Sequence, residues 1–293
     1  MYAFQHGIIA SGSGGGSTPL PISNLIAYSF RKVLPTATVS FRVRRSSDNA
    51  EQDIGFVGND LDTASLLSFV GANNGFVTKI YEQSGGGIDL TQTVATGQFQ
   101  IVASGVVNTM NGKPSCITGT TLSKYMLTTS LFNPSVVNGV SIFSVTKPIT
   151  HLGGGFAVDW LYSIGAGGAF TPSRFFDNNI PGTAGNPTTY NHNTQNGGSL
   201  ITTPYTSGTK LQGHLIKSGD NKYYQNNVLV GSNTNSLVTP SINQRLVING
   251  ISWTVGSTAS ANQYFSEILI YNSDESSNLT TIQNNINSYY SIY

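Results

Sequence analysis

The chain has 293 residues, of which only 9% are charged, and its formal net charge is +1. Ordinary globular chains carry roughly 25% charged residues, and proteins that bind nucleic acid present a basic surface, so this composition excludes nucleic acid as a partner. The single cysteine, Cys116, excludes an intramolecular disulfide, and no apolar run approaches the roughly 18 residues of a membrane span.

Residues 1–25 are predicted to form an N-terminal arm and a linker. Residues 11–21 are Gly, Ser, Thr and Pro apart from Leu20, and such a segment buries too little apolar surface to order itself. The first nine residues are more apolar than a plain tail, because they include Tyr2, Phe4, Ile8 and Ile9. We expect this arm to dock on another subunit. The alternatives are a disordered terminus and a strand that packs on its own domain.

From residue 26 onward the pattern is one of short strands separated by turns. Apolar and polar residues alternate at period two, as in half-buried strands, in residues 39–43, 76–81, 140–145, 245–248 and 264–271. Residues 222–225 and 228–230 flank Asn226-Asn227, which is typical of a two-residue hairpin turn.

Two short helices are predicted among the strands. Residues 62–69 begin with an acid and are followed by Gly71, a common helix stop. The second helix begins near Ser276 and places Leu279, Ile282, Ile286 and Tyr289 on one face. Many strands with only two short helices predict an all-β fold, a β-sandwich formed by residues 26–293 as one domain.

Residues 41–56 concentrate charge in a chain that otherwise avoids it. Arg42 and Arg44 share one face of a predicted strand, and three acids follow: Asp48, Glu51 and Asp53. One interpretation is a network in which the arginines hold a polar loop through bidentate carboxylate bonds. The alternative is a calcium site made by the three acids, against which the neighbouring arginine charges and the spacing both argue.

Several motifs of the first half of the chain carry a resemblance to a known family. They are AYSFRK, FRVRRSSDN, LDTASLL, IYEQSGGGIDLTQ and NGKPS, in this order. The chain resembles the catalytic domain of the fungal α-L-arabinofuranosidase B family, which implies a concanavalin A-like (laminin-G-like) jelly-roll β-sandwich. The residues that match the family's second marker are Tyr81, Gln83, Ser84, Gly85, Gly87, Leu90, Thr91 and Gln92. The strand and helix at the chain's end are also similar to those of the family.

The polar cluster in residues 79–92 is interpreted primarily as a structural turn, and only secondarily as a catalytic or ligand-binding site. Its glycines suit positive φ, and its Gln and Ser side chains suit bonds to backbone groups. We therefore expect structural roles for Glu82, Gln83 and Asp89. The same expectation holds for Glu267, a lone strand acid.

The resemblance implies a catalytic machinery that this chain does not match. In the family a central motif supplies the nucleophile, and a later loop supplies the acid/base Asp. Here Asp159 matches the first acid of the central motif, but Leu161 stands at the nucleophile position, and residues 249–257 contain no carboxylate. Hydrolysis by the two-carboxylate mechanism is therefore not expected. An enzyme with relocated acids, Asp159 and Asp177, remains the alternative.

The segment 151–214 is the least strand-like by pattern, and we expect its loops to form the binding surface. Aromatic faces beside Asn, Asp and His suit sugars, although each aromatic could equally belong to the core. The candidate glycan-binding residues are Asp159, Trp160, Tyr162, Asp177, Tyr190, Asn191, His192 and Tyr205. His192 has no second ligand at zinc spacing, and no cofactor is expected.

These observations predict a non-catalytic carbohydrate-binding module on a phage virion, of the spike or fibre type. The N-terminus has no secretory leader, which agrees with a virion protein released by lysis. The expected partners are a host-surface glycan and, through the arm, other virion proteins, with the chain forming a homo-oligomer at the virion surface. The alternatives are an active glycoside hydrolase and a purely structural capsid decoration protein.

Overall fold

The computed structural model describes residues 20–121, 124–129, 133–152, 158–165, 174–194, 199–237, 239–240, 243–250 and 261–293. The predicted docking arm and most of its linker therefore lie outside the described residues. The described chain forms an all-β sandwich with two short helices, as the sequence predicted.

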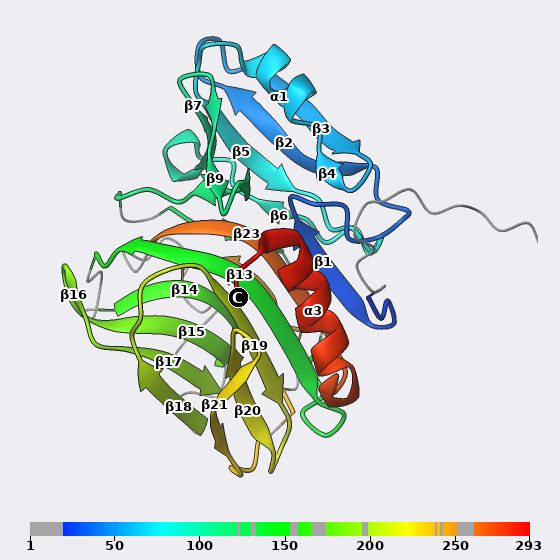
Figure 1. The fold of residues 1–293 in the computed structure, drawn as a ribbon, viewed down its shortest axis with the longest axis vertical. Helices are drawn as coiled ribbons and strands as arrows, with labels where there is room; N and C mark the ends of the chain where they lie inside the picture. The colour runs from blue at the N-terminus through cyan, green and yellow to red at the C-terminus, as the bar shows by residue number, and fades with distance from the viewer. Residues whose placement is uncertain are drawn as a thin grey trace, which may run out of the picture.

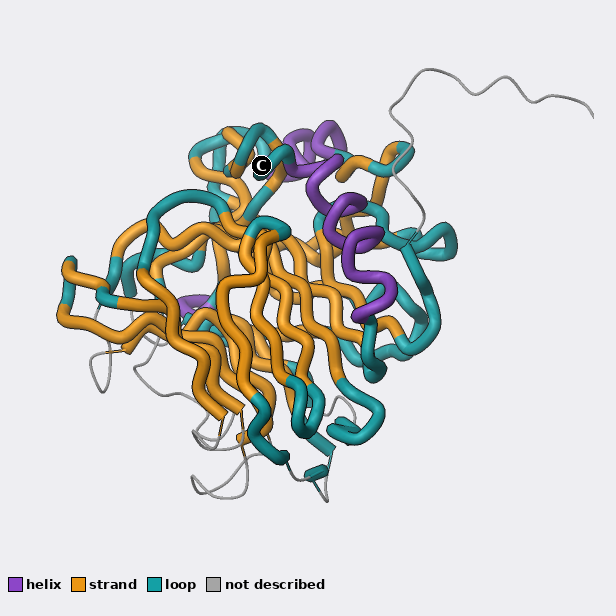
Figure 2. Tube along the Cα trace, turned by 60° about the horizontal axis from the view of Figure 1, so that its bottom comes forward, coloured by secondary structure: helices purple, strands orange, loops and turns teal. Residues whose placement is uncertain are grey.

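Two layers of antiparallel strands make the sandwich (Figures 1 and 2). The strands of the first layer are, in pairing order, β1 (Leu25–Ser29), β23 (Asn262–Tyr271), β13 (Val140–Thr150), β19 (Lys210–Ile216), β20 (Asn221–Gln225) and β21 (Val228–Asn233). The first and last strands of the described chain are thus neighbours, because β1 pairs with β23 from Leu25↔Tyr271 to Ser29↔Glu267.

The second layer contains most of the remaining strands, among them two short ones of two residues each. In pairing order these are β3 (Glu51–Val57), β2 (Val39–Arg45), β5 (Gly75–Ile80), β6 (Leu90–Thr91), β12 (Met126–Leu127), β22 (Arg245–Ile248), β14 (Val158–Gly165), β15 (Arg174–Thr183), β17 (Thr189–Thr194) and β18 (Ser199–Pro204). The layers connect through β7 (Phe99–Ala103) and β11 (Cys116–Ile117), which pair with β5, with each other and with β23. The other short strands are β4 (Asp60–Leu61), β8 (Val106–Val107), β9 (Thr109–Met110), β10 (Lys113–Pro114) and β16 (Asn186–Pro187).

The predicted hairpin is present between β20 and β21. Asn226 and Asn227 have φ values of 51° and 64°, the left-handed conformation that a type I′ turn needs at both central positions. The Asn226 Oδ1 also accepts a hydrogen bond of 3.0 Å from the Leu211 backbone N–H. This side chain therefore joins the turn to β19.

The two helices also agree with their predictions. Helix α1 (Thr63–Val70) is capped by Asp62, whose carboxylate accepts from the Ser65 backbone N–H at 2.9 Å, and it ends at Gly71 with φ 60°. Helix α3 (Leu279–Tyr290) follows a short 3₁₀ turn that begins at Ser276. None of the helices in the described part of the chain has the length and hydropathy to cross a bilayer.

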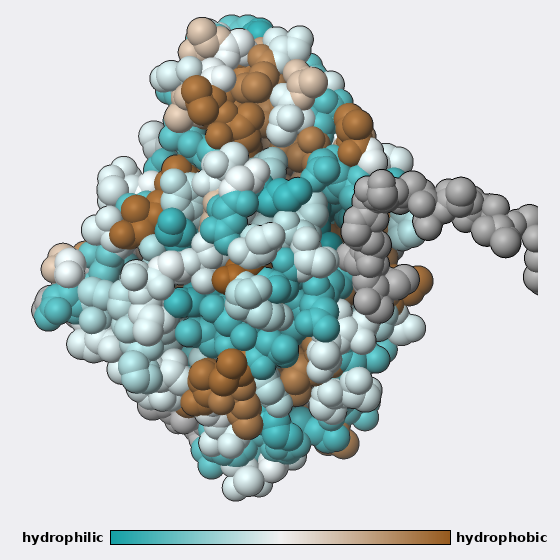
Figure 3. Space-filling view, in the orientation of Figure 1, coloured by the Kyte–Doolittle hydropathy of each residue, from teal (hydrophilic) through white to brown (hydrophobic). Residues whose placement is uncertain are grey.

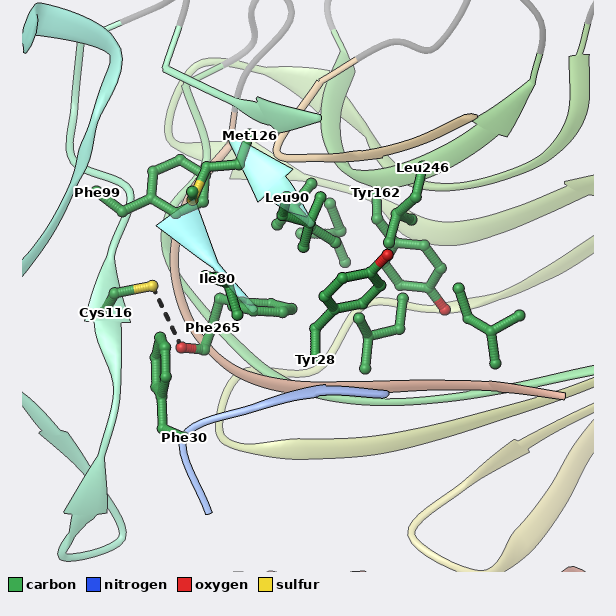
Figure 4. Close-up of a cluster of buried hydrophobic side chains, with 14 of the residues drawn as sticks. Tyr28, Phe30, Ile80, Leu90, Phe99, Cys116, Met126, Tyr162, Leu246 and Phe265 are labelled. Carbon is green, nitrogen blue, oxygen red and sulfur yellow. Dashed lines mark hydrogen bonds between the residues drawn. The ribbon is translucent and has the colours of Figure 1, made fainter. Parts of the chain in front are cut away.

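The hydrophobic core has two parts. The larger part fills the space between the layers, and Figure 4 labels ten of its residues, which come from both layers and from the segments that connect them: Tyr28, Phe30, Ile80, Leu90, Phe99, Cys116, Met126, Tyr162, Leu246 and Phe265. The smaller part lies on the outer side of the first layer, where Phe143, Val145 and Leu215 pack against Ile282 and Ile286 of α3. Helix α3 therefore covers this side of the sheet (Figure 1).

Candidate functional site: the outer face of β15, β17 and β18

The segment that was expected to be loops is built largely of strands, so that expectation was wrong for the described residues. Most of the candidate residues lie on β14, β15 and β17. The sequence TYNHNT of β17 contains two Asn and two Thr, and Asn is depleted in strands in general. Here pairing on both sides and burial of every second residue outweigh that propensity.

Strand geometry divides the candidates between two faces, because successive side chains point to opposite sides of a sheet. The register sets Asp177 opposite Asn193, Asn179 opposite Asn191, and Asn191 opposite Thr202. These five residues therefore share one side, which we call the polar face. The residues between them, among them Asn178, Tyr190 and His192, point to the interior of the sandwich.

Hydrogen bonds order the polar face. The Asp177 carboxylate accepts from the side-chain amides of Asn179 and Asn193, the second at 2.9 Å. The Asn191 Oδ1 accepts from the hydroxyls of Thr189 at 3.2 Å and Thr202 at 3.3 Å. The planar groups are thus held in fixed orientations before any ligand arrives.

The polar face becomes more accessible from β15 toward β18. Asp177 and Asn179 are buried, Asn191 and Asn193 are half-buried, and Thr202 is exposed. Of the candidate residues on this face, Asn191 is the one that a ligand could reach directly, whereas Asp177 acts by holding Asn193 in place.

Three predicted ligand residues belong instead to the interior, which corrects the expectation that they face a glycan. Tyr162 and Tyr190 are 0% exposed and His192 is 3% exposed, so none of the three can stack on a sugar without opening the sandwich. Tyr205 is half-buried, and its ring stacks on that of Tyr190 with 5.3 Å between centroids. The backbone of Trp160 pairs with Asn179, while its side chain lies outside the described part.

Asp159, the remaining candidate, lies on the opposite face from Asp177. It is paired with Ile180, three residues after Asp177 on β15, and an odd separation along a strand reverses the face. Its carboxylate accepts from the Leu152 backbone N–H at 2.8 Å and lies 3.1 Å from His151 Nδ1. The relocated pair of acids therefore cannot flank one glycosidic bond.

Outside this region the charged residues form structural contacts. Arg45 makes a bidentate pair with Asp48, which lowers the pKa of that carboxyl to about 2, and Arg42 makes one with Asp53, whose pKa is also lowered. The arginine network proposed from the sequence is thus present in part: Arg42 pairs with an acid as expected, whereas Arg44 donates to the amide oxygens of Gln98 and Asn49, both at 2.8 Å. The same carboxylates were the calcium candidates, and no cluster of three metal-binding side chains occurs within the described ranges.

The turn after β5 is held by its own polar side chains, as predicted. The Glu82 carboxylate accepts from the backbone N–H groups of Ala27, Ser84 and Gly86 at 2.7–3.1 Å. The Gln83 side chain accepts from the Val33 N–H and donates to the Ser29 and Arg31 carbonyls. These bonds fasten the turn to β1 and to the residues that follow it.

Comparison with known proteins yields structural similarity alone. No protein-family model and no curated protein matches the chain. Among solved structures, a GH54 α-L-arabinofuranosidase soaked with a cyclic sulfate inhibitor matches with a TM-score of 0.61 and 13% identity, over 90% of this chain and 62% of that one. A mutant of a GH54 α-L-arabinofuranosidase soaked with 4-nitrophenyl α-L-arabinofuranoside matches with a TM-score of 0.62 and 14% identity, over the same shares. An arabinofuranosidase complexed with arabinofuranosyl-α-1,2-xylobiose matches with 0.59 and 14%, over 88% and 61%.

The chain shares their fold. It spans less than two thirds of the length of these arabinofuranosidase chains. At this identity the similarity concerns the architecture of the sandwich, and the chemistry must be argued from the residues of the polar face.

Proposed function

We propose that the protein binds carbohydrate through the polar face, without cleaving it. The observation that carries the proposal is the row of Asn193, Asn191 and Thr202, which are amide and hydroxyl groups held in register on an accessible part of a rigid sheet. Amides supply both donors and acceptors, which is the complement that a sugar's hydroxyl groups require. Within the described residues the Asn191 Oδ1 has two partners, and its amide NH₂ makes no hydrogen bond, so this group is placed to donate to a ligand.

The fold supports the same class of ligand. The neighbours are arabinofuranosidases, one of them complexed with an arabinofuranosyl xylobiose. A sandwich of this kind can present a sugar-binding surface, and the described part of this chain offers polar groups on the polar face while placing Asp159 and Asp177 on opposite sides of the sheet. Binding without hydrolysis is the function that agrees with both.

We place this activity in attachment to a host-surface glycan by a virion protein of the spike or fibre type. A site with few hydrogen bonds would bind one sugar only weakly, near the millimolar range. Several copies acting together would raise the avidity. The N-terminal arm, by docking on other subunits, would supply those copies.

Binding of the full-length chain, multimerised on a streptavidin scaffold, to an array of bacterial-surface glycans tests the proposal. Asn191→Ala and Thr202→Val each remove hydrogen bonds from the polar face, so each should weaken binding about 2- to 10-fold, the effect of a net contribution of about 0.5–1.5 kcal/mol. Thr109→Val removes an exposed strand hydroxyl on β9 and should leave binding unchanged. Binding that survives the double variant Asn191→Ala/Thr202→Val would place the site elsewhere. Failure to bind any glycan would favour a structural capsid role.

Hydrolysis is the competing function, because the neighbours are enzymes. The opposite faces of Asp159 and Asp177 argue against it, as does the burial of Leu161, which is 0% exposed in the core. Incubation with 4-nitrophenyl α-L-arabinofuranoside should release no nitrophenol above the level of an Asp159→Asn/Asp177→Asn variant. Release that this double variant abolishes would establish an enzyme.

A further inference from the structure

One part of the core differs from the rest in the kind of side chain that fills it. This part lies between β13, β19 and β20 of the first layer and β14, β15, β17 and β18 of the second layer. Most of the core is aliphatic, but here the two layers meet through polar and aromatic side chains. We call this group the imidazole cluster: its centre is His192 of β17, His214 of β19 and Tyr223 of β20.

The three rings of the imidazole cluster are in direct contact. The His192 and Tyr223 rings stack with 3.5 Å between centroids, and His214 lies 4.8 Å from each of them. Because β17 belongs to one layer and β19 and β20 belong to the other, the stack joins the two layers. Both imidazoles are buried, with 3% and 2% exposure.

Several polar atoms in and around the imidazole cluster have no hydrogen-bond partner among the described residues. These atoms are both ring nitrogens of His192, His214 Nε2, Asn178 Oδ1 and Thr203 Oγ1. Buried polar atoms are normally bonded, so an imidazolium placed here would have two donors with nothing arranged to receive them. The site is therefore built for neutral rings.

Among the described residues, the groups that face the imidazoles offer no compensating negative charge. His192 and His214 face each other, together with Tyr162, Tyr190 and Tyr223, whose pKa values burial raises so that they stay uncharged. The other neighbours are neutral: Phe176 contacts His214, and Asn178 and Gln212 bond each other at 2.7 Å. Protonation of one imidazole also opposes protonation of the other.

We propose that the imidazole cluster makes the protein acid-sensitive, such that protonation of His192 and His214 separates the layer of β15, β17 and β18 from the layer of β19, β20 and β21. The polar face is carried by the strands that would move. Low pH would thus separate the layers in the half of the sandwich that contains the stacked rings. The layers in the aliphatic half around β2 and β5 would stay packed together.

The sign of the effect follows from proton linkage. Burial lowers the pKa of His214 to about 3 and also lowers that of His192, while a histidine in an open chain has a pKa of about 6.5. The opened state therefore binds protons that the closed state does not, and stability falls as the pH falls below about 6.5. For His214 alone, the equilibrium constant for opening should rise about 30-fold between pH 8 and pH 5.

Hydrogen–deuterium exchange of the full-length protein at pH 8 and pH 5, corrected for the intrinsic exchange rate, measures this opening. Backbone amides of β17, β19 and β20 should open at least 10-fold more often at pH 5, whereas those of β2 and β5 should change little. His192→Phe/His214→Phe keeps aromatic rings and removes both protonation sites, so it should flatten the response. His6→Gln removes a histidine that lies outside the described residues, and it should respond like the wild type.

An equal response in the double variant would overturn the proposal, and so would equal opening of both halves. If the double variant does not fold, a second measurement, made on the wild type, still tests the proposal. In ¹³C-labelled histidine spectra, His192 and His214 should stay neutral down to about pH 5 while the protein is folded. Titration of either ring near pH 6.5 in the folded state would refute the inference.

Discussion

Removal of the carboxylate of Glu267 should be among the most damaging single changes in this chain. Glu267 lies on β23 and is 0% exposed, and it receives a bidentate pair of hydrogen bonds from Arg31, at 2.7 and 2.9 Å. Ser29 donates to the same carboxylate at 2.7 Å. Arg31 is itself 5% exposed, and its guanidinium lies 5.4 and 5.9 Å from the rings of Tyr289 and Tyr290.

Glu267→Gln leaves the Arg31 guanidinium buried without its counter-charge. Breaking a buried ion pair from one side costs about 3–5 kcal/mol, because the remaining charge cannot be solvated. Asp53→Asn is a matched control: the Arg42–Asp53 pair is also bidentate, at 2.7 and 3.0 Å, but its side chains are 42% and 38% exposed. Screening by solvent limits such a pair to about 1 kcal/mol or less. Urea unfolding, monitored by tyrosine and tryptophan fluorescence, gives the change in the free energy of unfolding for both variants.

The double variant Arg31→Met/Glu267→Gln separates the charge effect from lost packing. It removes the unpaired charge and leaves an amide oxygen to accept from Ser29, so it should be more stable than Glu267→Gln alone by about 2 kcal/mol. Two results would show that burial does not control how much the ion pair contributes to the free energy of unfolding. One is an equal loss of stability in Glu267→Gln and Asp53→Asn, and the other is a double variant no more stable than Glu267→Gln.

Three further changes test other parts of the fold. Gly231→Ala places a Cβ that overlaps Ile201 of the facing β18, so it should cost about 1–3 kcal/mol in urea unfolding, and Ile201→Ala in the same chain should recover part of that loss. Asn226→Ala forces φ 51° on a residue that disfavours it and removes the bond to Leu211, so a loss of about 1–2 kcal/mol is expected, with Asn226→Gly losing less. Removal of residues 1–19 should leave the thermal unfolding midpoint within about 2 °C, since the packing of Leu20 on the α3 side of the core is retained. A large fall in that midpoint would show that the arm is part of the fold.

The elements that the sequence predicted well are those whose signals are local. The Asn226-Asn227 turn, the Asp62 cap and the spacing of Ile282 and Ile286 in α3 each depend on residues a few positions apart. The structural role of Glu82 was also visible, because its partners Ser84 and Gly86 are in the same turn.

The elements that the sequence did not predict depend on contacts between distant residues. The partner of Glu267 is Arg31, 236 positions away, and no pattern connects them. Strand β17 resembles a loop by composition and becomes a strand because β15 and β18 pair with both of its edges. This pairing also decides which candidate side chains face outward. Because the pairing could not be read from the sequence, buried Tyr190 and accessible Asn191 were placed in one group.

The fold is shared with arabinofuranosidase structures at 13–14% identity, and the contacts of the turn after β5 show how such a frame is held. Glu82 and Gln83 bind backbone N–H and C=O groups, and such bonds hold a turn whatever the neighbouring side chains are. A two-carboxylate site has a stricter need, since both acids must project from the same face. In this chain Leu161 fills the core where the resemblance implies a nucleophile, and Asp159 and Asp177 project from opposite faces of the sheet. In the view of Figure 3 most of the surface is polar or of intermediate hydropathy, with separate apolar patches at the top and toward the bottom. A shared sandwich frame therefore does not by itself require a shared chemistry, and the accessible amides of the polar face are where binding should first be tested.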